Sequence, residues 1–162
     1  MPDTRTFARA AVTALALVLL PACGDDSPTE PTMQVIEELD FAESLNIDLS
    51  TMKRLGNGSY TKDLVEGDGA AIEYGSDIDL SYIGWMADGT KVVESRFQFT
   101  LGLGAIPIGL QQAMLNQRDG GVRLMIIPPQ HMYGGVDHIG TEGVLIPGGS
   151  VLVFEVTVHA VV

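Results

Sequence analysis

Apolar and polar residues alternate along much of the second half of the chain. In Asp77–Tyr82 and in Phe97–Leu101 every second residue is apolar, and the same pattern runs through Val151–Val162. A period of two places the apolar side chains on one face of a β-strand. Val122–Ile127 is apolar at nearly every position and is closed by two prolines, which is typical of a buried strand. These four segments predict a β-rich domain.

One helical pattern interrupts the strands. Apolar residues in Ile106–Gln117 recur at positions 106, 110, 113 and 114, a spacing typical of a short amphipathic helix. The Asp88–Gly89 pair is a hairpin signal, and Gly and Pro crowd Gly134–Gly149, which predicts a long, exposed loop. We therefore predict an α+β fold in which a curved antiparallel β-sheet, a half-barrel, wraps around one short α-helix.

A second helical pattern precedes this domain. Met33–Leu45 carries apolar residues at helical spacing, with Thr32 as its N-cap. This predicts an amphipathic helix within an N-terminal segment, residues 33–55, that packs on a domain formed by residues 56–162. A dimerisation helix is the alternative interpretation, although we expect a monomer. The domain should fold without the segment, because it contains every predicted strand.

The first residues have the pattern of an export signal. Arg5 and Arg9 precede an apolar run, Ala10–Leu20, which is too short to span a bilayer but suits a signal peptide over residues 1–22. The run ends in Leu20-Pro21-Ala22-Cys23, which resembles a bacterial lipobox and implies lipidation at Cys23. A plain signal peptide is the alternative. Residues 23–32 are acidic and contain two prolines, so we expect a tether to a bacterial membrane, on its extracytoplasmic side.

Charge and composition exclude several classes of function. Nine Lys and Arg stand against 21 Asp and Glu, for a net charge of −12, which argues against a nucleic-acid partner. The single cysteine allows no disulfide within the chain. His131 and His138 lie near each other in the sequence, but two loop histidines are more typical of solvated residues than of a metal site. We expect neither a metal nor a cofactor.

Several stretches resemble the FK506-binding-protein class of peptidyl-prolyl cis-trans isomerases. They occur in the family's order from about Gly58 to the C-terminus. They are Tyr82-Ile83-Gly84-Trp85 with Asp88-Gly89-Thr90-Lys91, Phe97-Gln98-Phe99-Thr100-Leu101-Gly102, Ile126-Ile127-Pro128-Pro129 with Met132-Tyr133-Gly134, and Ile146-Pro147 with Leu152-Val153-Phe154-Glu155-Val156. The resemblance implies a half-barrel around a short helix, in agreement with the pattern of the strands.

The resemblance also implies an activity and a site. It implies isomerisation of Xaa-Pro bonds in proline-containing polypeptides, assisting protein folding outside the cytoplasm. Tyr133 and Tyr82 match positions that act on the substrate amide, and Tyr133 resembles the hydroxyl that bonds the substrate carbonyl. The expected substrate-binding residues are Phe97, Val92, Val93, Ile106, Leu110, Ile146 and Phe154.

The chain departs from the family pattern at the pocket. Val92-Val93 stands where Phe-Asp is usual, and Leu110 replaces a tryptophan. Pro107 falls, in a gap-free alignment, where a backbone N–H meets the peptide, and proline has none. The alternative function is therefore a catalytically weak or inactive module that binds peptides or acts as a chaperone.

Overall fold

The computed structural model describes residues 30–162. The predicted signal peptide, Cys23 and the tether up to residue 29 lie outside the described residues. Among residues 30–162, no helix is long and apolar enough to cross a membrane.

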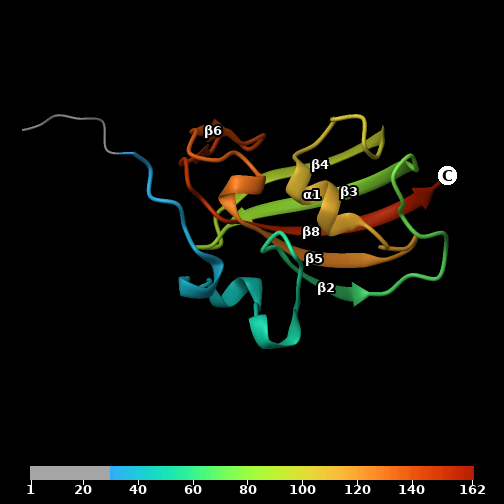
Figure 1. Ribbon diagram of the computed structural model, residues 1–162, viewed down its shortest axis with the longest axis horizontal. Helices are drawn as coiled ribbons and strands as arrows, with labels where there is room; N and C mark the ends of the chain where they lie inside the picture. Colours follow the sequence, from blue (N-terminus) through green and yellow to red (C-terminus); the bar gives the residue numbers. More distant parts are fainter. Residues whose placement is uncertain (1–29) are drawn as a thin grey trace, which may run out of the picture.

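Six strands form one antiparallel sheet with the order β1-β2-β5-β8-β3-β4 (Figure 1). The long C-terminal strand lies between β5 and β3 and so joins the two halves of the sheet. The strand bounds are β1 Lys53–Arg54, β2 Tyr60–Val65, β3 Asp77–Met86, β4 Lys91–Thr100, β5 Val122–Ile127 and β8 Leu152–Val161. The four strands predicted from the sequence are present, whereas β1 and β2 were not predicted. The antiparallel fold class is confirmed, and the sheet is not closed.

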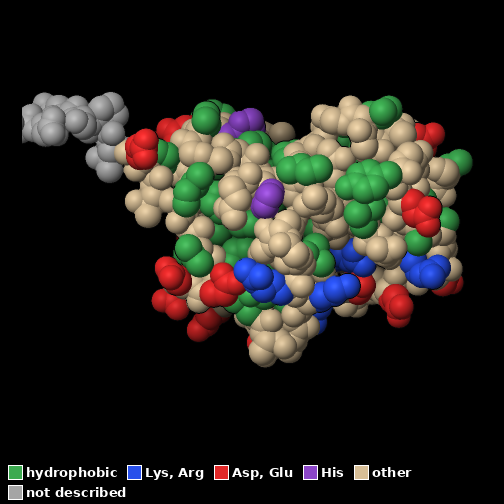
Figure 2. Space-filling view, viewed as in Figure 1, with side chains coloured by type: hydrophobic (Ala, Val, Ile, Leu, Met, Phe, Trp, Pro, Cys, Tyr) green, Lys and Arg blue, Asp and Glu red, His purple; other side chains and the backbone are tan. Residues whose placement is uncertain are grey.

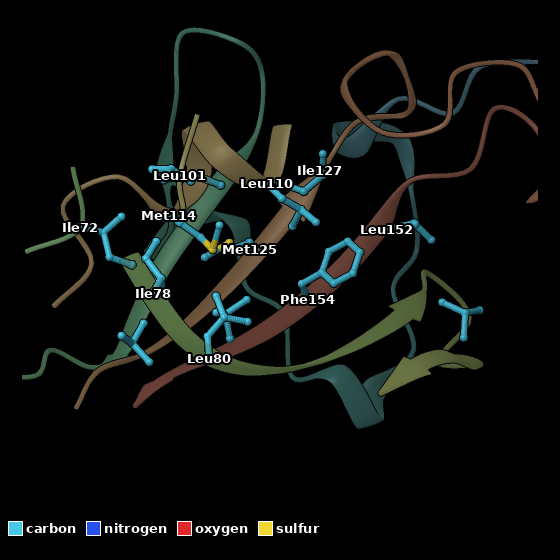
Figure 3. Packing of buried hydrophobic residues seen from close by; sticks show 14 of the residues in the cluster. Ile72, Ile78, Leu80, Leu101, Leu110, Met114, Met125, Ile127, Leu152 and Phe154 are labelled. Carbon is cyan, nitrogen blue, oxygen red and sulfur yellow. The ribbon is translucent and has the colours of Figure 1, made fainter. Parts of the chain in front are cut away.

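The only α-helix in the described part of the chain, α1 Ile108–Met114, lies across one face of this sheet (Figure 1). Leu110 and Met114 of α1 point toward Phe154 of β8, and Met125 and Ile127 of β5 complete this part of the core (Figure 3). All five side chains are buried. Alternation explains the arrangement, because residues 125, 127, 152 and 154 share the helix-facing side of the central strands.

The N-terminal segment covers the opposite face of the sheet. Ile126 and Val153, which alternate with the helix-facing residues, pack there with the fully buried Ile36. Further residues of the segment pack against this second cluster, namely Leu39, Phe41, Leu45, Ile47, Leu49 and Met52. The sheet is therefore covered on both sides in its central strands.

The prediction of an amphipathic helix over Met33–Leu45 is wrong. This range instead forms two single turns of 3-10 helix, η1 Ile36–Glu38 and η2 Glu43–Leu45, and a third, η3 Leu49–Thr51, follows it. The extended backbone of Leu39 ends η1, and Asn46, whose φ of 49° is left-handed, ends η2. A straight helix would present one narrow apolar stripe, whereas the broken path lets seven apolar residues follow the curved sheet.

The loop between Tyr133 and Leu152 contains more structure than its composition indicates. A short hairpin, β6 His138–Ile139 paired with β7 Leu145–Ile146, lies within it (Figure 1). The turn η4 Pro129–His131 links β5 to this loop. The predicted long, exposed loop therefore contains a short hairpin; Val136, Ile139 and Leu145 are exposed as expected, whereas Ile146 is buried.

Candidate functional site

A cavity of about 330 Å³ lies between α1 and the sheet. It is bounded by β3, β4 and β8, by the start of α1, and by the residues after η4. In Figure 2, hydrophobic side chains lie along the upper part of the face that carries α1, and a band of Lys and Arg lies below them. The lining side chains include no charged group; they are Leu80, Tyr82, Val93, Ser95, Phe97, Ala105, Ile106, Pro107, Leu110, Met114, Met132, Tyr133, Phe154 and Val156.

Three aromatic rings form one wall of this cavity. The Tyr82 ring meets Phe97 edge-to-face, with centroids 5.7 Å apart, and lies 6.2 Å from the tilted ring of Phe154. Phe97 in turn stacks on Phe99 at 4.8 Å. Offset and edge-on contacts of this kind hold aromatic rings in fixed orientations. The wall is therefore a preformed apolar surface.

Gly84 makes room for this wall. A side-chain carbon at Gly84 would lie 2.6 Å from a Val93 methyl group and 2.7 Å from the Phe154 ring. Gly84 is paired with Val93 on β4 and with Phe154 on β8. The missing side chain is thus what allows both neighbours to turn toward the cavity.

Tyr133 enters the cavity from the opposite side. Its ring is half-buried and stacks on the imidazole of His138, with centroids 4.0 Å apart and planes inclined by 13°. Burial and the nearby Tyr82 raise the pKa of Tyr133 above its ordinary value. Burial also raises the pKa of Tyr82, and the Ser95 side chain offsets part of this effect. Both phenols therefore stay neutral near pH 7 and can donate a hydrogen bond.

The helix that floors the cavity is anchored at both ends. At its start, the Gln111 amide donates to the carbonyl of Ile106 at 2.8 Å. At its end, Arg123 of β5 donates to the carbonyls of Ala113 and Leu115, each at 3.0 Å. Arg123 is itself paired with Asp63 of β2. The two bonds from Arg123 satisfy carbonyls that the C-terminal end of a helix leaves free, and they fix α1 against the sheet.

Comparison with known proteins assigns the family. Residues 69–159, more than half of the chain, match the FKBP_C family of FKBP-type peptidyl-prolyl cis-trans isomerases. The chain belongs to this family.

Relatives and solved structures agree with that assignment. An FK506-binding protein of Neisseria meningitidis serogroup B is 36% identical over 104 residues, which cover 61% of this chain and 92% of that protein. Human FK506-binding protein 15 is 33% identical over 113 residues, but the match covers 62% of this chain and only 9% of that protein.

The folds of two proteins with known crystal structures are similar to the fold of this chain. A peptidyl-prolyl cis-trans isomerase from Pseudomonas syringae pv. tomato aligns with a TM-score of 0.60 and 26% identity, over 68% of this chain and 80% of that one. FkpA from Escherichia coli aligns with a TM-score of 0.59 and 25% identity, over 74% and 55%.

Most of the site residues expected from the FKBP resemblance come together at the cavity. Those that line it are Tyr82, Val93, Phe97, Ile106, Leu110, Tyr133 and Phe154. Val92 and Ile146 do not line it. Val92 is fully buried under the Gly140–Val144 turn, and Ile146 is buried in the core.

The position of Val92 has a simple physical cause. Adjacent residues of a strand point to opposite faces, so Val92 and Val93 cannot both face one cavity. Val93 faces the cavity, whereas the carbonyl of Val92 accepts a hydrogen bond from the Glu142 amide on the covering turn. The placement of Val92 in the pocket wall is therefore a wrong prediction.

Six lining residues were not predicted from the sequence, whereas Pro107 lines the cavity as its place in the family alignment implies. Leu80, Ser95 and Val156 each lie two positions from a predicted cavity residue on the same strand, so strand alternation could have found them. Ser95 is the informative one, because it is paired with Tyr82 and supplies a polar group beside the aromatic wall. The others are Ala105, Met114 and Met132, and Met132 has no sequence signal other than its place before Tyr133.

Proposed function

We propose that this protein catalyses the cis-trans isomerisation of Xaa-Pro bonds in polypeptides. The observation that carries the proposal is the uncharged cavity in which Tyr82, Phe97 and Phe154 form an aromatic wall opposite the neutral phenol of Tyr133. Membership of the FKBP family supports the same reaction.

The reaction needs a surface of this kind. Rotation about the peptide bond must overcome a barrier of about 18–20 kcal/mol, because amide resonance is lost in the twisted form. The planar amide is the more charge-separated form, so an apolar surface disfavours it relative to the twisted amide. No proton has to be transferred and no nucleophile is required, which fits the absence of charged residues from the cavity lining.

Separate parts of the cavity then have separate tasks. The proline ring is uncharged and fits against the aromatic wall of Tyr82, Phe97 and Phe154. The Tyr133 hydroxyl donates a hydrogen bond to the carbonyl of the twisting amide. A donor placed for the twisted carbonyl stabilises the transition state more than the planar ground state. Ile106 and Leu110 close the floor.

The setting proposed for this activity is the extracytoplasmic side of a bacterial membrane. It rests on the signal-like residues 1–22 and on Cys23 in the lipobox-like sequence. A lipid-anchored isomerase there would act on exported chains while they fold. Replacing Cys23 with serine should move the protein from the membrane fraction to the soluble fraction; an unchanged mass and distribution would contradict lipidation.

A second function is favoured by specific residues of the cavity. Leu110 is smaller than the tryptophan that the family resemblance leads one to expect, and Val93 lacks the carboxylate of the expected aspartate. Pro107 lines the cavity and has no N–H to offer a peptide. These features favour peptide binding with little catalysis.

Exchange NMR on a short Xaa-Pro peptide distinguishes the two functions. The wild type should increase the cis-trans exchange rate, and Tyr133→Phe should reduce that increase by about 3- to 10-fold, as expected for one hydrogen bond. Tyr74→Phe is the matched control, because this tyrosine is 57% exposed and does not line the cavity. Peptide binding without any change in exchange rate would establish the binding module instead.

A further inference from the structure

The N-terminal segment holds the loop that carries Tyr133. Gln34 contacts the far end of this loop twice: its backbone N–H donates to the carbonyl of Gly149 at 2.9 Å, and its side-chain oxygen accepts from the N–H of Val151 at 2.7 Å. Val151 is fully buried, whereas Gln34 is exposed, so this bond ties the buried residue that precedes β8 to the N-terminal segment at the surface.

A continuous row of hydrogen bonds leads from Gln34 to the neighbour of Tyr133. Gly149 accepts from Gln34 through its carbonyl and donates through its N–H to the carbonyl of Gly134 at 2.7 Å. Gly134 donates in turn to the carbonyl of Pro129 in η4 at 2.8 Å. Gly134 directly follows Tyr133, so the row fixes the backbone at the base of this side chain.

The backbone of the loop and that of the N-terminal segment are in close contact around this row of hydrogen bonds. A side-chain carbon at Gly149 would collide with the carbonyl of Thr32, and one at Gly148 would collide with the carbonyl of Gly135. A carbon added at Gly135 would lie 2.9 Å from the ring of Pro31. Residues Pro31–Gln34, here termed the N-terminal clasp, therefore pack directly on both ends of the loop.

We propose that Gln34 is a positioning residue for Tyr133 and that it acts as part of the N-terminal clasp. The clasp lies outside residues 69–159, the part that matches the family, and Gln34 does not line the cavity. It acts through the Gly149–Gly134 row, which keeps the Tyr133 hydroxyl aimed at the substrate carbonyl. This inference rests on the proposed isomerase activity.

Gln34→Ala in the full chain tests the clasp. The variant keeps the backbone N–H that donates to Gly149 but removes the side-chain acceptor for Val151. Amide hydrogen exchange should become about 3- to 10-fold faster at Val151 first, and at Gly149 because the loosened clasp no longer holds its row of bonds. The isomerisation kcat for an Xaa-Pro peptide should fall by about 3- to 10-fold with little change in KM, because the aromatic wall that binds the proline is untouched. Gln34→Glu keeps an oxygen acceptor and should restore both values.

Two comparisons separate positioning from general destabilisation. Asp48→Ala removes the side-chain cap of η3 in the same segment, away from the loop, and should leave kcat unchanged. In the Tyr133→Phe background, Gln34→Ala should cause no further loss, because the group that it positions is already gone.

Several results would overturn the inference. Unchanged exchange at Gly149 and Val151, an equal loss of kcat in Asp48→Ala, or a full additional loss in the Tyr133→Phe background would each do so. An inactive wild type would refute the proposed function instead. The clasp would then be judged from hydrogen exchange and from the Kd of the same peptide, and unchanged values of both in Gln34→Ala would overturn it.

Discussion

Replacing Ile36 with alanine measures how firmly the N-terminal segment is built into the fold. Ile36 is 2% exposed and packs on Ile126 and Val153, on the side of the sheet opposite α1. The neighbouring Val35 is 46% exposed. These two adjacent β-branched residues therefore differ mainly in burial, which makes Val35→Ala a matched control.

The expected loss follows from the buried carbons. The change removes three carbons, and each contributes about 0.8 kcal/mol of transfer free energy, so the transfer loss is about 2.4 kcal/mol. A residual cavity raises the cost of such changes to about 2–5 kcal/mol. The surrounding residues Leu39 and Phe41 are only partly buried and can close part of the space, so we expect a loss of about 2–3 kcal/mol.

Urea unfolding monitored by circular dichroism gives the free energies of unfolding of the Ile36→Ala and Val35→Ala variants. Ile36→Ala should lower the midpoint with an unchanged m-value, whereas Val35→Ala should change the free energy by less than about 0.5 kcal/mol. A loss below that limit for Ile36→Ala would refute the view that the segment completes the core. If the loss is that small, a chain beginning at Asn57 should also melt cooperatively, because residues 56–162 would fold without the segment. If Ile36→Ala instead loses about 2–3 kcal/mol, the chain beginning at Asn57 should melt without cooperativity.

Three further predictions concern acid stability, the pH dependence of activity and the shape of the pocket. Hydrogen bonds, first from Arg96 and then from Gln98, lower the pKa of Asp79 to about 2. Because this folded-state pKa lies below the unfolded one, the stabilisation is complete above about pH 4 and is lost as the pH falls toward 2. The urea midpoints of wild type and Asp79→Asn should therefore converge between about pH 4 and 2, and a constant difference would contradict this assignment. Peptide isomerisation should be nearly constant between pH 6 and 8, because the raised pKa values of Tyr82 and Tyr133 keep both phenols neutral. A tenfold change in the exchange rate over this range would show that the reaction depends on an ionisable group outside this pair. Val93→Asp combined with Leu110→Trp should raise kcat/KM by about tenfold, equivalent to about 1.4 kcal/mol of transition-state stabilisation. Adding Val92→Phe should only lower the free energy of unfolding, by about 1–3 kcal/mol, because it overpacks a core position. A gain in activity from Val92→Phe would mean that this side chain reaches the cavity.

The three longest strands of the sheet could be predicted from the sequence because their patterns are long. β3, β4 and β8 each extend over ten residues, and strand alternation is unambiguous at that length. β2 was missed because Tyr60–Val65 is buried at its first two residues and exposed at its last three, so no alternation is visible. Its pairing with β5 is a long-range contact that no local pattern encodes.

The N-terminal segment shows where periodicity misleads. The apolar residues of Met33–Leu45 fit a helix by spacing, but the surface that they must cover is a curved sheet. Two 3-10 turns within this range, with the left-handed Asn46 directly after the second, follow that surface more closely. Tertiary packing decided the local structure here, as it does when helix propensity is only weak.

The pocket could be predicted in part for the same reasons. Residues on regular strands, such as Tyr82, Phe97 and Phe154, lie where the family resemblance and alternation place them. Val92 was assigned with its neighbour although strand geometry separates them. The role proposed for Gln34 depends on a loop of 18 residues, between Tyr133 and Leu152, folding back on the N-terminal segment, and nothing in the sequence indicates that contact.

The central claim is that an Xaa-Pro segment is bound and twisted in the cavity between α1 and the sheet. Intermolecular NOEs between the proline ring of a short Xaa-Pro peptide and isotope-labelled protein test it most directly, with cis-trans exchange recorded on the same sample. Contacts from the proline ring to the ring protons of Tyr82, Phe97 and Phe154, together with accelerated exchange, are the predicted result. Accelerated exchange with proline contacts confined to other parts of the surface, or no contacts and no acceleration at all, would contradict the account.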